Sequence, residues 1–343
     1  MEERQNWELL SLFESTDYVR KWYKRRHKYE LNLQRSREIT SNFTQAKEYF
    51  ASSKNSATTV KPLLLYYGVL SLSRGLILLL DKNKSESSMA QSHGLEVVNW
   101  RETLSKPKNS VLDLKIRTTK GTFRELVSAT TNREFVSVVN MPDRNAGMYH
   151  YEFKRPLFAD DDNVQISLDD LLSRSSRLLG MYSECTGRNE RAHLGQILSF
   201  QTNAEVCIIQ SQDMCKDLLI AGKRLPDMES KFNSIDSRFP IPTLNFTVKG
   251  NDLNDIKQYL PIISHQSGAM QYIIEDFPNG DIMSTLLRMF LLSYYMGMLV
   301  RYFPSHWIAL IQNQVGDTIQ PLLLASVTDI QVNFPKLVHE RLG

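Results

Sequence analysis

Two apolar stretches of the sequence each carry a pair of tyrosines followed by an arginine. Tyr67 precedes Arg74 by seven residues, and Tyr294 precedes Arg301 by the same interval. Because seven residues make about two turns of an α-helix, each tyrosine shares a helix face with its arginine. Phenols and a guanidinium on one face can hold a phosphate group by charge-assisted hydrogen bonds and stacking. Helices of similar composition also produce this repeat by chance, so the repeat alone does not define a site.

The candidate binding surface lies on the first stretch and just after it. Tyr67, Ser71 and Arg74 fall on one helical face. The predicted ligand-binding residues combine two cations, two phenols and an imidazole: Lys61, Tyr66, Tyr67, Arg74 and His93. The alternative is structural, with Arg74 buried against a carboxylate and the tyrosines packed in the core.

Arg301 and His306 carry the catalytic alternative. An Arg and a His at this separation near a helix end resemble the pair of HEPN ribonucleases, which cleave RNA through its 2′-OH without a metal. His306 would act as general acid or base, and Arg301 would stabilise the phosphorane. However, Pro304 lies inside the spacing and ends or kinks the helix. In the structural alternative, His306 and Trp307 pack in the segment that follows.

A basic and aromatic run, RKWYKRRHK, covers residues 20–28. Interleaved cations and aromatic rings can bind nucleic acid or phosphorylated ligands. More often such a run is a solvated helix face, with Trp22 and Tyr23 turned into the core.

The sequence carries few patterns typical of metal or cofactor sites. Pro142-Asp143 with Glu152 and Lys154 loosely fits the PD…ExK pattern of metal-dependent nucleases, but PDRNAG is also an ordinary hairpin loop. The seven histidines form no HxxxH or HExxH pair, and the 15 glycines form no phosphate-binding loop. We expect no cofactor and no metal site.

The elements that must position these residues are mostly helical. Residues 1–110 are predicted to form an N-terminal helical region with a core helix at 62–80. Residues 111–116 alternate with period two, a turn signal follows at 120–121, and two short strand patterns flank the PDRNAG loop. Residues 111–165 are therefore predicted to form a small antiparallel β insertion. Residues 166–343 are predicted to form a helical and mixed region, with short strands near 205–210, 243–249 and 270–274. Its core helix at 283–303 is expected to pack with 1–110 as one core. The expected fold class is α+β, predominantly α-helical, with central buried helices.

Both core helices are nearly long enough to span a membrane. Arg74, Arg288 and Arg301 interrupt them, and an arginine near a bilayer centre costs at least ~2.5 kcal/mol. We therefore expect the helices to be buried against each other in a soluble domain. Gly68 and Gly297 would permit their close approach to neighbouring helices.

Composition limits the class of protein. Lys and Arg number 41 against 38 Asp and Glu, a net charge of +3 that is too small to indicate a nucleic-acid binder. Three cysteines without a CxxC pair predict neither a disulfide scaffold nor a zinc ribbon. The chain opens MEERQNWELL without a signal-peptide pattern, so we expect a cytoplasmic protein.

Two anchors of the sequence resemble the YaaC-like family. The first is VKPLLLYYG at residues 60–68, continuing to SHGL at 92–95, and the second is RYFPSHW at 301–307. The resemblance implies a cytoplasmic bacterial protein of poorly defined function, with no established catalytic residues. Some members are encoded beside IMP dehydrogenase, which implies a link to purine metabolism. The family pattern does not require a histidine at the position of His306.

These observations together predict a non-catalytic regulatory or interaction protein. It would sense a phosphorylated ligand or nucleotide, or bind a purine-metabolism enzyme as its protein partner. The alternative is a HEPN-like, metal-independent ribonuclease that uses Arg301 and His306.

Overall fold

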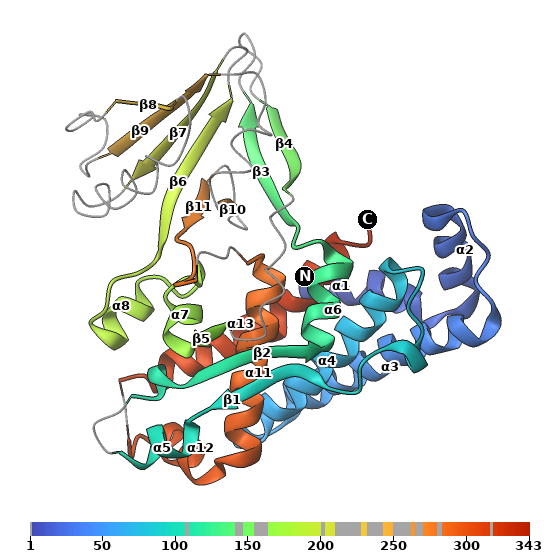
Figure 1. Ribbon diagram of the computed structural model, residues 1–343, viewed down its shortest axis with the longest axis horizontal. Coiled ribbons are helices and arrows are strands. Elements are labelled where there is room, and N and C mark those ends of the chain that lie inside the picture. The colour runs from blue at the N-terminus through green and yellow to red at the C-terminus, as the bar shows by residue number, and fades with distance from the viewer. Residues whose placement is uncertain are drawn as a thin grey trace.

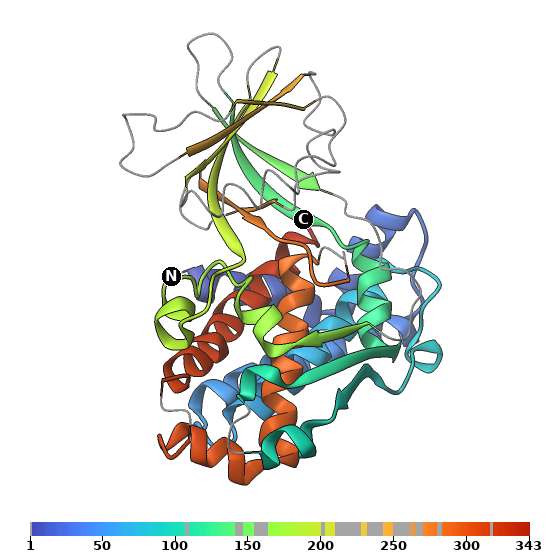
Figure 2. The same ribbon diagram turned by 60° about the vertical axis from the view of Figure 1, so that its left-hand side comes forward.

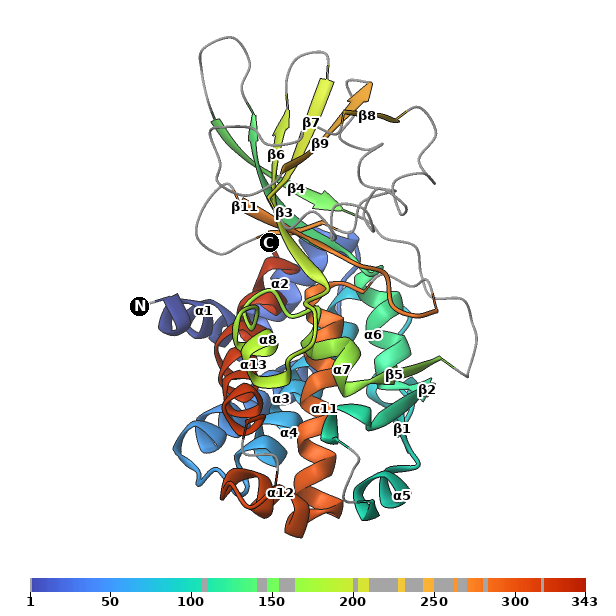
Figure 3. The same cartoon turned by 90° about the vertical axis from the view of Figure 1, so that its left-hand side faces the viewer.

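The computed structural model describes residues 2–106, 110–140, 147–153, 164–199, 203–209, 228–231, 243–249, 262–264, 270–279, 283–315 and 318–343. The helices form one body, and a large sheet stands at one end of it (Figures 1 and 3). The described helices and 3-10 turns are α1 (Glu2–Leu10), η1 (Ser11–Glu14), α2 (Thr16–His27), α3 (Leu33–Asn55), α4 (Lys61–Leu80), η2 (Glu86–Ser88), α5 (Trp100–Ser105), η3 (Val111–Asp113), α6 (Thr122–Thr130), α7 (Leu168–Leu172), α8 (Met181–Thr186), α11 (Thr285–Tyr302), α12 (Pro304–Ile311) and α13 (Gln320–Glu340). The described strands are β1 (His93–Val98), β2 (Lys115–Gly121), β3 (Glu134–Asn140), β4 (Gly147–Phe153), β5 (Gln165–Ser167), β6 (Ala192–Ser199), β7 (Asn203–Ile209), β8 (Met228–Lys231), β9 (Thr243–Lys249), β10 (Ile262–Ser264) and β11 (Met270–Ile274).

The predicted core helices α4 and α11 lie against each other at the centre of the helical body (Figure 2). Every residue of α11 from Leu286 to Val300 is buried, as expected for a helix that is apolar on nearly all sides. Gly297 makes the contact possible, because a Cβ there would lie only 2.8 Å from the Cβ of Tyr66 in α4. The fold is therefore α+β and predominantly helical around two buried helices.

Helix α3 covers the next face of α4. Two glycines of α4, two turns apart, meet two phenylalanines of α3 that are also two turns apart. A Cβ at Gly68 would lie 2.7 Å from the Phe50 ring, and a Cβ at Gly75 would lie 2.8 Å from the Phe43 ring. The matched spacing lets the helix axes approach closely along two turns.

Of the helices that the structure describes, α4 alone is long and apolar enough to cross a membrane. Within its most apolar window, 67% of the residues are buried inside the protein. Neighbouring helices therefore supply the apolar surroundings that its composition requires, and α4 is built as a core helix.

A small antiparallel sheet in the order β1-β2-β5 packs on α11. In the middle strand, Ile116 pairs with Val97 on one side and with Ile166 on the other. The Tyr295 hydroxyl of α11 lies 3.0 Å from the Leu114 carbonyl and also contacts that of Ile166. This buried hydroxyl joins the central helix to the backbone of the sheet.

The larger sheet has the strand order β10-β11-β6-β7-β9-β8, and β3 joins it by pairing with β4 and, in parallel, with β6. The expected hairpin on either side of residues 141–146 is present as β3 and β4. Strands expected near 205–210, 243–249 and 270–274 are present as β7, β9 and β11.

Strands also lie outside the predicted insertion at 111–165. β1 precedes the range 111–165, and the strands from β6 onward follow it. Residues 111–113, expected to begin a strand, form the turn η3, whose first backbone groups are capped by Ser110. Pairing such as that of β6 with β11 joins segments far apart in the chain, so no local periodicity reports it.

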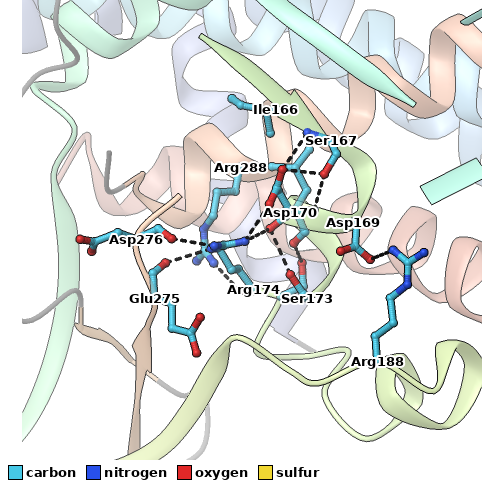
Figure 4. A network of polar contacts seen from close by, with 12 residues as sticks. Ile166, Ser167, Asp169, Asp170, Ser173, Arg174, Arg188, Glu275, Asp276 and Arg288 are labelled. Carbon is cyan, nitrogen blue, oxygen red and sulfur yellow. Dashed lines mark hydrogen bonds and ion pairs between the residues drawn. The ribbon is translucent and has the colours of Figure 1, made fainter. Parts of the chain in front are cut away.

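A buried polar cluster lies where the chain leaves β11 for α11 (Figure 4). The Arg174 side chain is fully buried, and its guanidinium donates to the backbone carbonyls of Asp170 (3.0 Å), Glu275 (2.9 Å) and Asp276 (2.6 Å). It also contacts the Asp170 carboxylate at 3.3 Å. Arg288 of α11 donates to the Arg174 carbonyl. The cluster fixes α7 and the segment after β11 against the central helix.

Candidate functional site

A polar groove of about 720 Å³ runs between α3, α4 and the loop at residues 81–92. Its lining side chains follow helical spacing, because residues three or four apart share one face. From α3 they are Gln34, Glu38, Asn42, Gln45 and Tyr49. From α4 they are Tyr67, Leu70, Ser71 and Arg74, and from the loop they are Glu86, Ser87 and Gln91.

The groove walls are held together by contacts between these elements. The rings of Tyr49 and Tyr67 stack with centroids 5.7 Å apart. Ser71 donates to the Gln45 side chain at 2.9 Å, which joins α4 to α3. The Glu86 backbone amide donates to the Glu38 carboxylate at 3.1 Å, which holds the loop on α3.

Tyr67 and Arg74 are the two predicted ligand-binding residues that line the groove. Arg74 is half-buried, and its guanidinium donates to the Ala90 carbonyl at 3.3 Å. The Tyr67 hydroxyl lies 3.0 Å from an exposed guanidinium, that of Arg301 in the last turn of α11. Tyr67 thus links the groove to the arginine that the catalytic alternative required.

The buried Tyr66 and the half-buried His93 form a pair beside the groove. The Tyr66 hydroxyl lies 2.7 Å from His93 Nδ1, and Tyr294 of α11 packs edge-on against the Tyr66 ring at 5.5 Å. Burial raises the pKa of Tyr66 strongly. Burial, followed by the charge of Arg301, lowers the pKa of His93. Both effects favour neutral side chains, with the Tyr66 hydroxyl donating to an unprotonated Nδ1.

Lys61 lies outside the groove. It is the first residue of α4, and its carbonyl accepts a hydrogen bond from Ser53 at 3.2 Å. The predicted set therefore divides into two groove residues, the neighbouring Tyr66–His93 pair and one cation at the start of the helix.

His306 and Arg301 lie in separate helices. Helix α11 ends at Tyr302, and Pro304 is the first residue of α12. Proline favours this position because the first backbone N–H of a helix has no partner within the helix. His306 Nε2 lies 3.3 Å from the Leu104 carbonyl, and its Nδ1 is buried without a hydrogen-bond partner. The described contacts of Arg301 are with Tyr67 and Tyr302.

Sequence reasoning missed the contribution of α3. Its groove residues recur at intervals of four, four, three and four, which is a polar stripe that the sequence shows. No local feature of the sequence shows that this stripe lines a groove rather than an open helix surface. Asp143 and Lys154 of the PD…ExK pattern lie outside the described residues. Among the residues that are described, no three His, Cys, Asp or Glu side chains gather as a metal site would require.

The fold and the groove define a class of protein, a predominantly helical α+β body with a polar cleft beside its central helix pair. A family model, described as YaaC-like Protein, matches residues 11–342, so the chain belongs to the YaaC-like family. The match includes the central helices, the groove and both sheets. No curated protein and no solved structure matches the chain.

Proposed function

We propose that the groove between α3 and α4 binds a small phosphorylated ligand of the nucleotide type. The protein acts in the cytoplasm through this binding, as a regulatory or interaction protein rather than an enzyme. The observation that carries the proposal is the cavity of about 720 Å³ that gathers amides, phenols and a guanidinium from three segments. This volume lies within the usual range for small-molecule sites.

The lining suits a planar ligand with several donors and acceptors. The groove contains four amide side chains, and each amide offers both a donor and an acceptor. Tyr49 and Tyr67 add an aromatic wall, on which a heterocycle can pack. These are the contacts by which proteins read an unpaired base.

The charge of the groove favours one phosphate group over several. Arg74 is the cation in the lining, and Glu38 and Glu86 are the carboxylates. A polyanion would be repelled by the two carboxylates. A single phosphate can pair with Arg74, or with Arg301 across Tyr67, by charge-assisted hydrogen bonds.

A ligand in the groove would contact α3, α4 and the loop at 81–92 together. Binding would then stabilise one arrangement of that loop on the helices, which is how a ligand shifts a population of conformations. Such a change can be read by another protein. The expected contact with a purine-metabolism enzyme stays a prediction.

The geometry at His306 favours binding over the ribonuclease alternative. A general acid or base needs a ring nitrogen that reaches the substrate. In His306 one nitrogen is buried and the other lies near the Leu104 carbonyl. We expect the purified protein to leave single-stranded RNA intact. Cleavage that is lost on His306→Ala would favour the enzyme instead.

The test is calorimetric titration of the full chain with AMP and GMP. We expect binding, and an affinity about tenfold lower for Arg74→Gln, because the change removes a charge-assisted contact. Arg37→Gln is the matched control, since Arg37 is exposed on α3 and outside the groove lining. Absence of binding, or equal affinity in Arg74→Gln and wild type, would overturn the proposal.

A further inference from the structure

A second cavity, of about 540 Å³, lies where the ends of α2, α4 and α6 meet the last residues of the chain. Four cationic side chains line it: Arg26, Lys82, Arg133 and Arg341. Asp81 is the carboxylate in the lining. The cations come from segments separated by 50 residues or more, so the fold gathers positive charge that the sequence disperses.

The end of the basic run 20–28 forms one wall. Trp22 and Tyr23 are buried in the core, which leaves the cations of α2 facing outward. The His27 Nε2–H donates to the Leu79 carbonyl at 2.7 Å, which ties the end of α2 to the end of α4. Arg26 therefore belongs to a cavity wall that is fixed in place, although its own side chain is exposed.

The opposite wall is held by a chain of hydrogen bonds. Arg341 donates to the carbonyls of Leu337 (2.7 Å) and Arg133 (2.8 Å). Arg133 in turn donates to the Thr131 hydroxyl at 2.6 Å. These contacts hold two guanidinium groups in position before any ligand arrives, which lowers the entropy cost of binding one.

We propose that this basic cavity binds a small molecule that carries a chain of phosphates. The lining has four cations and one carboxylate, which leaves an excess of positive charge. A single phosphate, with a charge of about −1.5 to −2, does not balance that positive charge. A triphosphate has both the charge and the several oxygens that two guanidinium groups can bind. Because the α2 rings are buried and cannot stack on bases, a small polyanion fits the cavity better than an RNA strand.

The basic cavity is distinct from the α3–α4 groove and shares none of its lining residues. The groove is lined by more carboxylates than cations, whereas the basic cavity has the opposite balance. The two sites therefore take different ligands, and either proposal can fail without the other.

The test is titration of the full chain with inorganic tripolyphosphate at about 0.15 M salt, where long-range attraction is screened. We expect binding that weakens about tenfold in Arg26→Gln and in Lys82→Gln. Both residues are exposed, so the variants should fold. Arg25→Gln is the matched control, because Arg25 is an exposed neighbour outside the cavity lining. Arg74→Gln, in the groove, should also bind tripolyphosphate as wild type does.

Parallel titrations with ATP and adenosine show whether the cavity recognises the phosphate chain or the nucleoside. Equal affinity for ATP and tripolyphosphate, with none for adenosine at this cavity, would show that the phosphate chain is the recognised part. Failure of wild type to bind, or an equal loss in Arg25→Gln, would overturn the proposal. Tighter binding of a single-stranded RNA than of tripolyphosphate would also overturn it, and would assign the surface to nucleic acid.

Discussion

The Tyr67 side chain joins three elements of the candidate site. Its ring stacks on Tyr49 of α3, its hydroxyl lies 3.0 Å from the Arg301 guanidinium of α11, and its own helix is α4. The neighbouring Tyr66 points instead into the core, where it meets His93. Adjacent residues on a helix lie about 100° apart, so one tyrosine can line a groove while the next is buried.

The Tyr66–His93 pair predicts a dependence of stability on pH. Burial, followed by the Arg301 charge, lowers the His93 pKa from 6.5 in the folded protein. The unfolded chain therefore binds a proton that the folded chain resists, and stability falls as the pH drops below ~6.5. We expect His93→Gln to lose less stability than wild type between pH 7.5 and pH 5.5.

Urea unfolding at the two pH values measures this difference. Burial also lowers the pKa of His339, but His339 contributes equally in both proteins, so the comparison isolates His93. An identical loss in wild type and variant would contradict the prediction.

Arg174 predicts a large loss of stability on truncation. Its guanidinium is fully buried and satisfies three backbone carbonyls and the Asp170 carboxylate (Figure 4). Arg174→Met should cost about 3–5 kcal/mol, because these acceptors stay buried without a donor. Arg188→Met is the control. The Arg188 side chain is 41% exposed and pairs with Asp169 at 2.8 Å, and such surface pairs contribute about 0–1 kcal/mol. Equal melting temperatures for the two variants would show that the Arg174 contacts add little.

At the scale of elements, glycines decide how closely the central helices pack. Gly68 and Gly75 bring α4 onto α3, and Gly297 brings α11 onto α4. The two contacts differ in what opposes a larger residue. At Gly68 the nearest atoms belong to the side-chain ring of Phe50, and the Tyr49 Cβ lies farther away, at 3.2 Å. At Gly297 the nearest atom is the Tyr66 Cβ, which moves only with its backbone.

We therefore expect Gly297→Ala to destabilise the protein more than Gly68→Ala. Overpacking a core contact costs about 1–3 kcal/mol. Replacing a helical glycine by alanine returns up to about 1 kcal/mol of helix propensity in both variants. Thermal unfolding of both variants measures the difference. A Gly297→Ala protein as stable as wild type would show that α11 shifts to accept the methyl group.

At the scale of the whole molecule, one hydrophobic core joins the two ends of the chain. Its buried members extend from Leu10 to Leu342 and include residues of α3, α4, α11 and α13. The Trp22 indole donates to the Leu342 carbonyl at 3.1 Å, which joins the first helices to the last residues.

The shared core predicts that residues 1–110 do not fold by themselves. In the fragment, α4 would lose its cover of α11 and α13 and expose an apolar face to water. We expect the isolated fragment to aggregate or to lack a cooperative thermal transition, with the full chain as the control. A soluble fragment with a sharp transition would show instead that the N-terminal region is an independent domain.

Much of the helical framework could be predicted because its signals are local. The stretches at 62–80 and 283–303 each carry more apolar side chains than the single buried face of an amphipathic helix can hold. Their central position in the fold therefore follows from composition. Pro304 marks the end of α11 for a reason contained in the residue itself. Tyr67 and Arg74 share a face because the helical period places them there.

By itself, the sequence determined the helical class, the two buried helices, the Tyr67–Arg74 face and the YaaC-like anchors, because each depends on residues within a few turns of one another. Only the tertiary structure decided that the α3 amides complete a groove and that Arg301 contacts Tyr67, 234 residues away in the chain. It also decided that Arg26, Arg133 and Arg341 line one cavity. Those contacts depend on how helices dock. Docking is set by the sum of many small packing contributions across the core, and no short segment of the chain contains that sum.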